Sequence, residues 1–132
     1  MPQSNAPLSL PISLPMSPDR YFPHERLVAW QLSREAVRFV AARRHKLRGL
    51  PGNAGPQLER AVVGAHTAVC SGAAAEGAER RRIFRGALSE AAEAGGCTDT
   101  ALDFGAFDLG EHQTLRAILL RLCACLRGLA RR

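Results

Sequence analysis

The apolar positions of this chain recur every three or four residues in four separate stretches, which is the spacing of an α-helix. The pattern predicts helices over residues 24–46, 56–71, 78–103 and 111–130. The last stretch is the most regular, because one face carries Leu115, Ile118, Leu119, Leu122, Leu126 and Leu129. Turn-forming residues separate the stretches. We therefore expect an all-α fold, an antiparallel up-down-up-down four-helix bundle over residues 24–132.

The second and third helices are expected to form the central hairpin. A glycine in a helix interior costs about 1 kcal/mol relative to alanine, so Gly95-Gly96 is a natural stop. The apolar stripe that begins at Ile83 nevertheless continues in phase as far as Ala101. We expect one unbroken helix here, with a close helix crossing or a bend at the two glycines.

The first helix has apolar residues on more than one face. Leu27, Trp30, Val37 and Ala41 share one side, while Val28, Leu32 and Phe39 project from nearly the opposite side. A helix with two apolar faces needs two partners, which favours self-association. Small residues form a second stripe on the far side of the second helix. The predicted oligomer interface contains Val28, Leu32, Phe39, Gly64, Thr67 and Ser71.

Residues 1–23 contain six of the eight prolines, so neither a helix nor a central strand is expected there. We expect a disordered, Pro-rich, polyproline-like tail. Two alternatives remain open: the tail covers the second face of the first helix, or it docks as a peptide in a groove of another protein.

The chain carries a formal charge of +6, which suits an anionic partner. Basic residues gather on the first helix and at the start of the third, where cations oppose the helix dipole. A cluster of cations at a helix start, where the helix dipole disfavours them, marks a candidate phosphate site. The predicted nucleic-acid-binding residues are Arg34, Arg38, Arg43, Arg44, Lys46, Arg48, Arg80, Arg81, Arg82 and Arg85. The alternative is a solvated face, or a basic edge that meets the acidic edge of another subunit.

No catalytic constellation, cofactor motif or metal site is predicted. The four cysteines form no C-x-x-C pair, and the four histidines lack metal-ligand spacing. No Ser/His/Asp arrangement, phosphate loop or pair of Glu-x-x-His motifs occurs. No apolar run approaches the ~18 residues of a membrane span, and no signal peptide is recognisable. We expect a cytoplasmic protein that is not an enzyme.

Short motifs along residues 25–130 resemble one known family. The first helix contains Leu27-Val28-Ala29-Trp30-Gln31, similar to an L-x-V-W-Q-like opening. The other matches are Gln57, Leu58, Arg60, Ala61 and Gly72 in the second helix, and Ile83-Phe84, Ala87 and Glu93 in the third. These residues resemble the bacterial four helix bundle protein family, which includes proteins encoded within ribosomal RNA intervening sequences and accessory variability determinants of diversity-generating retroelements. Ala68 and Ser71 stand where that family has Asn and Glu.

The resemblance implies a homopentameric bundle, and in the retroelement members a basic surface that binds nucleic acid and a reverse transcriptase. Two functions therefore compete. The first is an accessory protein that binds RNA or DNA through basic side chains. The second is a protein-interaction or scaffolding bundle with no role on nucleic acid.

Overall fold

The computed structural model describes residues 20–132, and every regular element within them is helical. A 3-10 turn, η2 (Pro23–Arg26), precedes helix α1 (Val28–Ala42) and the short helix α2 (Arg44–Leu47). A second 3-10 turn, η3 (Pro51–Asn53), leads into α3 (Ala54–Ala74), α4 (Gly77–Asp103) and α5 (Leu109–Arg131). The predicted disordered tail lies almost wholly outside the described residues. None of the helices described is long and apolar enough to cross a membrane.

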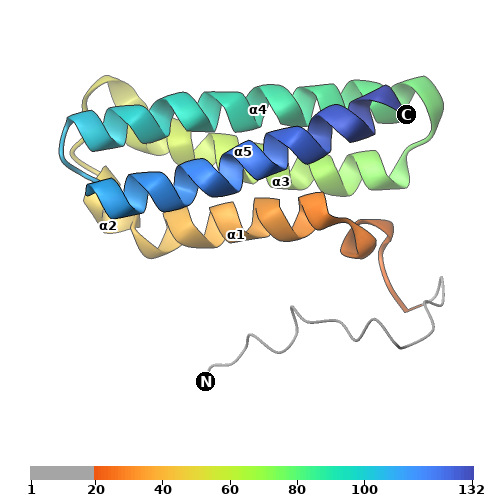
Figure 1. The fold of residues 1–132 in the computed structure, drawn as a ribbon, viewed down its shortest axis with the longest axis horizontal. Coiled ribbons are helices and arrows are strands. Elements are labelled where there is room, and N and C mark those ends of the chain that lie inside the picture. Colours follow the sequence, from red (N-terminus) through yellow and green to blue (C-terminus); the bar gives the residue numbers. More distant parts are fainter. Residues whose placement is uncertain (1–19) are drawn as a thin grey trace.

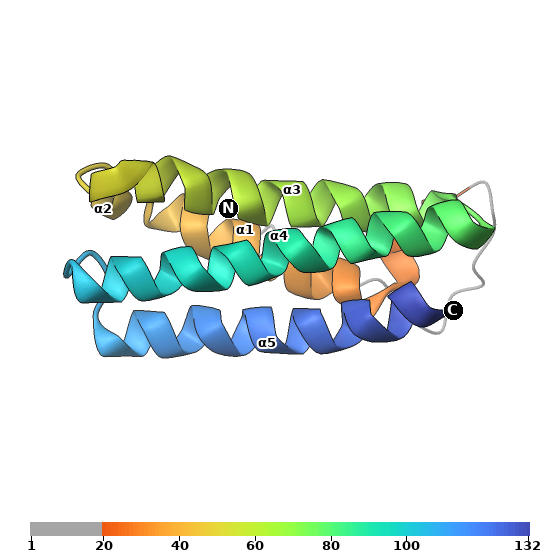
Figure 2. The same ribbon diagram turned by 90° about the horizontal axis from the view of Figure 1, so that it is seen from above.

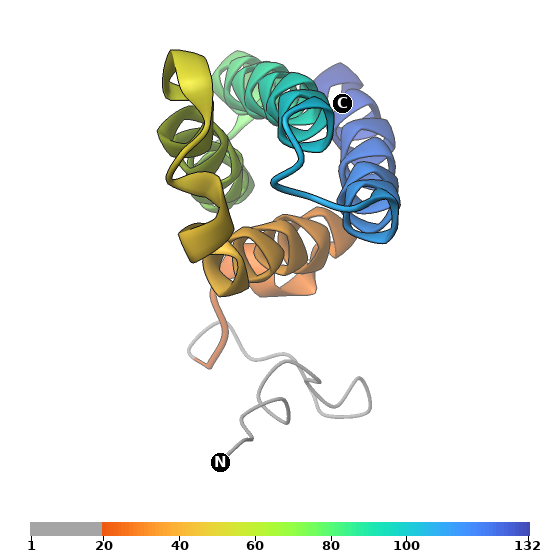
Figure 3. The ribbon, with the colours of Figure 1, turned by 90° about the vertical axis from the view of Figure 1, so that its left-hand side faces the viewer.

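The four long helices lie side by side around a shared core. Contacts join α3 to α4, α4 to α5, α1 to α3 and α1 to α5, so each long helix packs on two others. Successive long helices run in opposite directions (Figures 1 and 2), and the end-on view shows them at the corners of a square (Figure 3). The core between them is built of leucine, alanine and valine, with Phe84 and Phe107 its largest fully buried side chains.

The first predicted helix is divided into the 3-10 turn η2, α1 and α2, and its faces differ from those expected. Leu27, between η2 and α1, has an extended backbone, with φ −96° and ψ 134°. The backbone leaves helical geometry at Arg43, with φ −114° and ψ 14°, and α2 begins after it. The buried residues of α1 are Ala29, Trp30, Leu32, Ser33, Ala36 and Val40. The alanines and the serine are small residues that let α1 approach the core closely.

The prediction of one long third helix is confirmed, since α4 runs unbroken through Gly95 and Gly96. The close crossing expected there is wrong, because a Cβ added at either glycine would meet no atom within 4 Å. Close approaches occur elsewhere. A Cβ at Gly72 would lie 2.9 Å from the Phe84 ring, and one at Gly55 would collide with the carbonyl oxygen of Leu47. These two glycines let α4 and α2 pack closely against α3.

Helix α5 begins two residues earlier than predicted because of a capping box. The Asp108 carboxylate accepts the backbone N–H of Glu111 at 2.8 Å, and the Glu111 carboxylate accepts the N–H of Asp108 at 3.0 Å. This exchange satisfies two backbone donors at the helix start. It also fixes the Glu111 side chain at the turn between α4 and α5.

Candidate nucleic-acid interface

Three of the predicted phosphate-binding residues are held in ion pairs near α2. Arg43 and Lys46 both donate to one oxygen of Glu111, at 2.9 and 2.7 Å, and we call these three residues the Glu111 clip. Arg44 pairs with Glu59 of α3 at 2.7 Å. Arg43 stands at the break between α1 and α2, and Lys46 lies in α2. All three cations thus already have a carboxylate partner within the fold.

The electrostatics of the clip favour the charged carboxylate. The hydrogen bond from Lys46, the backbone hydrogen bond from Asp108 and the bond from Arg43 lower the pKa of Glu111 to about 2, against a smaller opposing effect of burial. Its side chain is only 13% exposed. Glu111 thus neutralises part of the basic cluster that the sequence pattern assigned to nucleic acid.

Two of the four arginines at the start of α4 also have partners within the fold. Arg80 donates to the carbonyl oxygens of Gly72 and Ala73, at 3.3 and 3.5 Å, and its guanidinium lies 4.9 Å from the ring centre of Phe84. A cation that is unfavourable at the start of α4 is favourable at the end of α3, which lies beside it. Arg82 binds Glu79 through two hydrogen bonds.

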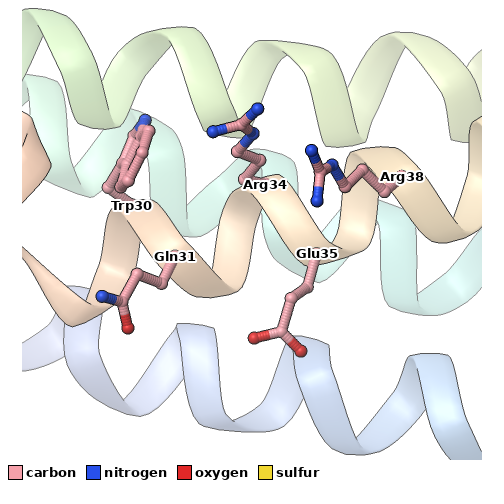
Figure 4. A pocket seen from close by; sticks show the side chains of 5 residues that line it. All are labelled: Trp30, Gln31, Arg34, Glu35 and Arg38. Carbon is pink, nitrogen blue, oxygen red and sulfur yellow. The ribbon is translucent and has the colours of Figure 1, made fainter. Parts of the chain in front are cut away.

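Five predicted residues form neither an ion pair nor a side-chain hydrogen bond within residues 20–132: Arg34, Arg38, Arg48, Arg81 and Arg85. Arg34 and Arg38 line a surface pocket with Trp30, Gln31 and Glu35 (Figure 4). The Arg34 guanidinium lies 5.4 Å from the centre of the Trp30 ring. Partial burial and the neighbouring charge of Arg38 lower the pKa of Arg34 below its ordinary value.

Helix α5 carries further arginines that the sequence interpretation left out of the site. They are Arg116, Arg121, Arg127, Arg131 and Arg132, all exposed and all without an acidic partner in the described part of the chain. The signal was present, because no acidic residue follows Glu111.

The register between α4 and α5 places arginines of both helices at similar levels along the molecule. His112 of α5 bonds Asp99 of α4 at 2.8 Å, and the two helices run in opposite directions. Counted in helical turns from that pair, Arg85 and Arg127 both lie about four turns away, and Arg81 and Arg131 about five. We call these four residues the arginine seam. None of the four forms an ion pair within residues 20–132.

An aromatic cluster adjoins the start of α1. The rings of Phe22 and His24 are stacked, with centroids 5.5 Å apart and planes within 9° of parallel. His24 lies against Trp30, at 5.5 Å and tilted by 48°. We call these residues the ring stack. Phe22 is 67% exposed, whereas Trp30 is buried. Phe22 precedes the predicted first helix and His24 is its first residue, and neither was predicted to belong to a site.

Two residues of the predicted oligomer interface are used inside the fold. Leu32 is only 2% exposed and lies in the core, so its placement on an outer face was wrong. Gly64 faces α4, because a Cβ there would lie 2.5 Å from the Glu90 carboxylate. Phe39 is half-buried, and its ring packs edge-to-face with that of Phe107, with the ring centroids 5.8 Å apart. Val28, Thr67 and Ser71 are exposed.

Polar groups in the interior serve packing. His66 contacts the hydroxyl of Ser33 at 2.9 Å, and that hydroxyl also donates to the carbonyl of Trp30. Burial, followed by the nearby His24 and Arg34, lowers the pKa of His66, which favours its neutral form. No carboxylate hydrogen-bonds to His66 among the residues described, and no cluster of metal-binding side chains occurs there either.

Comparison with protein-family models gave no match to this chain, and comparison with curated proteins gave none either.

Proposed function

We propose that this chain is a non-enzymatic accessory protein that binds the phosphate backbone of RNA or DNA through its arginine seam. In this proposal residues 24–132 form an antiparallel four-helix bundle that self-associates. The family resemblance makes a reverse transcriptase the partner protein to test first.

The observation that carries the proposal is the unbalanced charge of the seam. Arg81 and Arg85 lie at similar levels to Arg127 and Arg131 on two packed helices, and none of the four has an ion-pair partner among residues 20–132. Like charges placed together oppose folding, so an anionic ligand that neutralises them gains free energy on binding. Arginine suits this ligand because its guanidinium can bind phosphate through two hydrogen bonds. By contrast, the clip residues already have a carboxylate partner.

Fluorescence anisotropy with a labelled 20-base-pair duplex, titrated at several salt concentrations, tests the proposal. Each phosphate contact contributes about 0.9 to the slope of log K against log salt. Replacing Arg85 and Arg127 together by alanine should lower that slope by about 2 and weaken binding at low salt. No binding by the wild-type protein at micromolar concentration and low salt would refute the proposal.

The matched control replaces two arginines that already have carboxylate partners, Arg44 and Arg82. This variant loses the same formal charge as the seam variant. Its duplex affinity should fall less, because both side chains are occupied within the fold. Equal losses in the two variants would mean that net charge alone, and no particular surface, accounts for binding.

A scaffolding bundle without a nucleic-acid role is the second candidate. Val28 and Val63 support it, because these large apolar side chains are 54% and 43% exposed to solvent on α1 and α3. Light scattering on the purified protein measures self-association, and a homopentamer is the state that the resemblance implies. A strict monomer that binds no nucleic acid would refute both candidate functions.

A further inference from the structure

We infer that the ring stack of Phe22, His24 and Trp30 is a stacking site for an unpaired base, so that this protein binds single-stranded nucleic acid in preference to duplex. The inference rests on the proposed function, since it names the form of nucleic acid and a second contact that recognises it.

Among residues 20–132, only His24 stacks on Phe22, so one face of the Phe22 ring has no aromatic neighbour there. Phe22 is parallel to His24 on one face, and its side chain is 67% exposed. His24 in turn lies on the buried Trp30, which anchors the stack to α1. A planar base placed on the free face of Phe22 would extend the stack by one member. Stacking on aromatic side chains is the common means by which proteins hold single strands without reading their sequence.

The charge around the stack suits the phosphates that flank such a base. Arg34 and Arg38 follow Trp30 along the same side of α1, while Glu35 lies on the other side, directed toward α5 (Figure 4). Arg20 and Arg26 are exposed and flank the stack in sequence, with Glu25 the one acidic residue between them. Among residues 20–132, no carboxylate pairs with any of these four arginines.

The position of the stack agrees with that of the arginine seam. The turn η2, the start of α4 and the carboxyl end of α5 all lie at one end of the molecule (Figure 1). In a duplex the bases are already stacked on one another, so the ring stack can add nothing to duplex binding. In a single strand the bases are free to leave the strand and stack on Phe22.

Three labelled probes of equal length test the inference by anisotropy: a thymidine 20-mer, an abasic strand with the same phosphates, and the 20-base-pair duplex. Replacing Phe22 by alanine should weaken binding of the thymidine strand about tenfold, within the range measured for loss of one stacking contact. Binding of the abasic strand and of the duplex should not change.

Phe104 provides the control. It is 64% exposed, closely matching Phe22, but it lies after the end of α4, at the opposite end of the molecule. The Phe104→Ala variant should bind all three probes as the wild type does. Equal thymidine affinity of Phe22→Ala and wild type would overturn the inference, as would an equal loss on the abasic strand. A Phe22→Ala variant that changes the oligomeric state would place a second copy of the chain on the stack, which also overturns it.

Failure of the inference and failure of the proposed function give different results. If the wild type binds none of the three probes at low salt, the proposed function fails. If it binds all three with similar affinity and Phe22→Ala has no effect, the phosphate-binding function stands and the stacking site alone is refuted.

Discussion

The Glu111 clip provides a quantitative test of how the first and last helices are held together. Replacing Glu111 by glutamine removes the negative charge but keeps a side-chain oxygen that can accept the N–H of Asp108. The capping box is therefore largely preserved, and the change acts on the two contacts with Arg43 and Lys46.

The magnitude follows from the pKa of Glu111. A fall from the ordinary value of 4.5 to about 2 corresponds to about 3 kcal/mol of stabilisation when the carboxylate is charged. Arg43 and Lys46 are 29% and 39% exposed, so solvent screens part of this energy. A further part comes from the backbone hydrogen bond of Asp108, which the glutamine variant largely keeps. We expect Glu111→Gln to lower the free energy of unfolding by about 1.5–2 kcal/mol at pH 7.

The dependence on pH has a definite sign. Because folding lowers this pKa, the stabilisation is complete above about pH 4.5 and is lost as the pH falls toward about 2. The difference between wild type and Glu111→Gln should therefore shrink to less than half its neutral value by about pH 3. Urea unfolding followed by circular dichroism at 222 nm, at pH 7 and pH 3, measures both differences.

The control is Glu79→Gln, which removes a fully exposed carboxylate paired with Arg82 and should leave stability unchanged. If Glu111→Gln is as stable as the wild type at pH 7, the clip does not hold the helices together. If its deficit is the same at pH 3 as at pH 7, the loss comes from packing or capping, and the electrostatic reasoning is wrong.

Three further changes test the packing. Gly55→Ala should cost about 1–3 kcal/mol in urea unfolding, because the new methyl group collides with the backbone carbonyl of Leu47, which cannot move aside as a flexible side chain would. Gly96→Ala should raise stability by about 0.5–1 kcal/mol in the same assay, since this helical position has open space around it, and a loss would show a contact that the structure lacks. Leu122→Ala should cost about 2–5 kcal/mol and lower the thermal midpoint, because Leu122 is fully buried in the core.

Much of the fold follows from periodicity, and the exceptions have physical causes. The stripe from Leu115 to Leu129 predicted the bounds of α5 to within two residues, because large leucines at helical spacing form a single apolar face. In α1 half of the buried residues are small (Ala29, Ser33 and Ala36), so the spacing of its large residues did not show that Leu32 faces the core. The break at Arg43 leaves no mark of its own in the sequence, since neither proline nor glycine occurs there. It is accompanied by contacts with Glu111, which is 68 residues away.

The candidate interface was less predictable than the fold. Arg81 and Arg85 belonged to the predicted set, and they have no acidic partner among the residues described. Arg80 looked equivalent to them by sequence, but it binds carbonyl oxygens at the end of α3, which only the hairpin brings near. A charge count along one helix cannot show which cations are neutralised from another helix. Partners distant in sequence decide which arginines remain available to a ligand.

The order of the helices has a consequence for how the molecule is made. Helices α3 and α4 are joined by only two residues, Ala75 and Glu76, so this hairpin can form as soon as α4 has been synthesised. Helix α1 is synthesised earlier but packs on both α3 and α5, and the Glu111 clip spans 65 and 68 residues. Closing so long a loop is slow compared with forming a hairpin. During translation, the face of α1 that packs on α5 therefore stays exposed until α5 has been synthesised. In this interval the nascent chain is most prone to aggregation and to binding by chaperones.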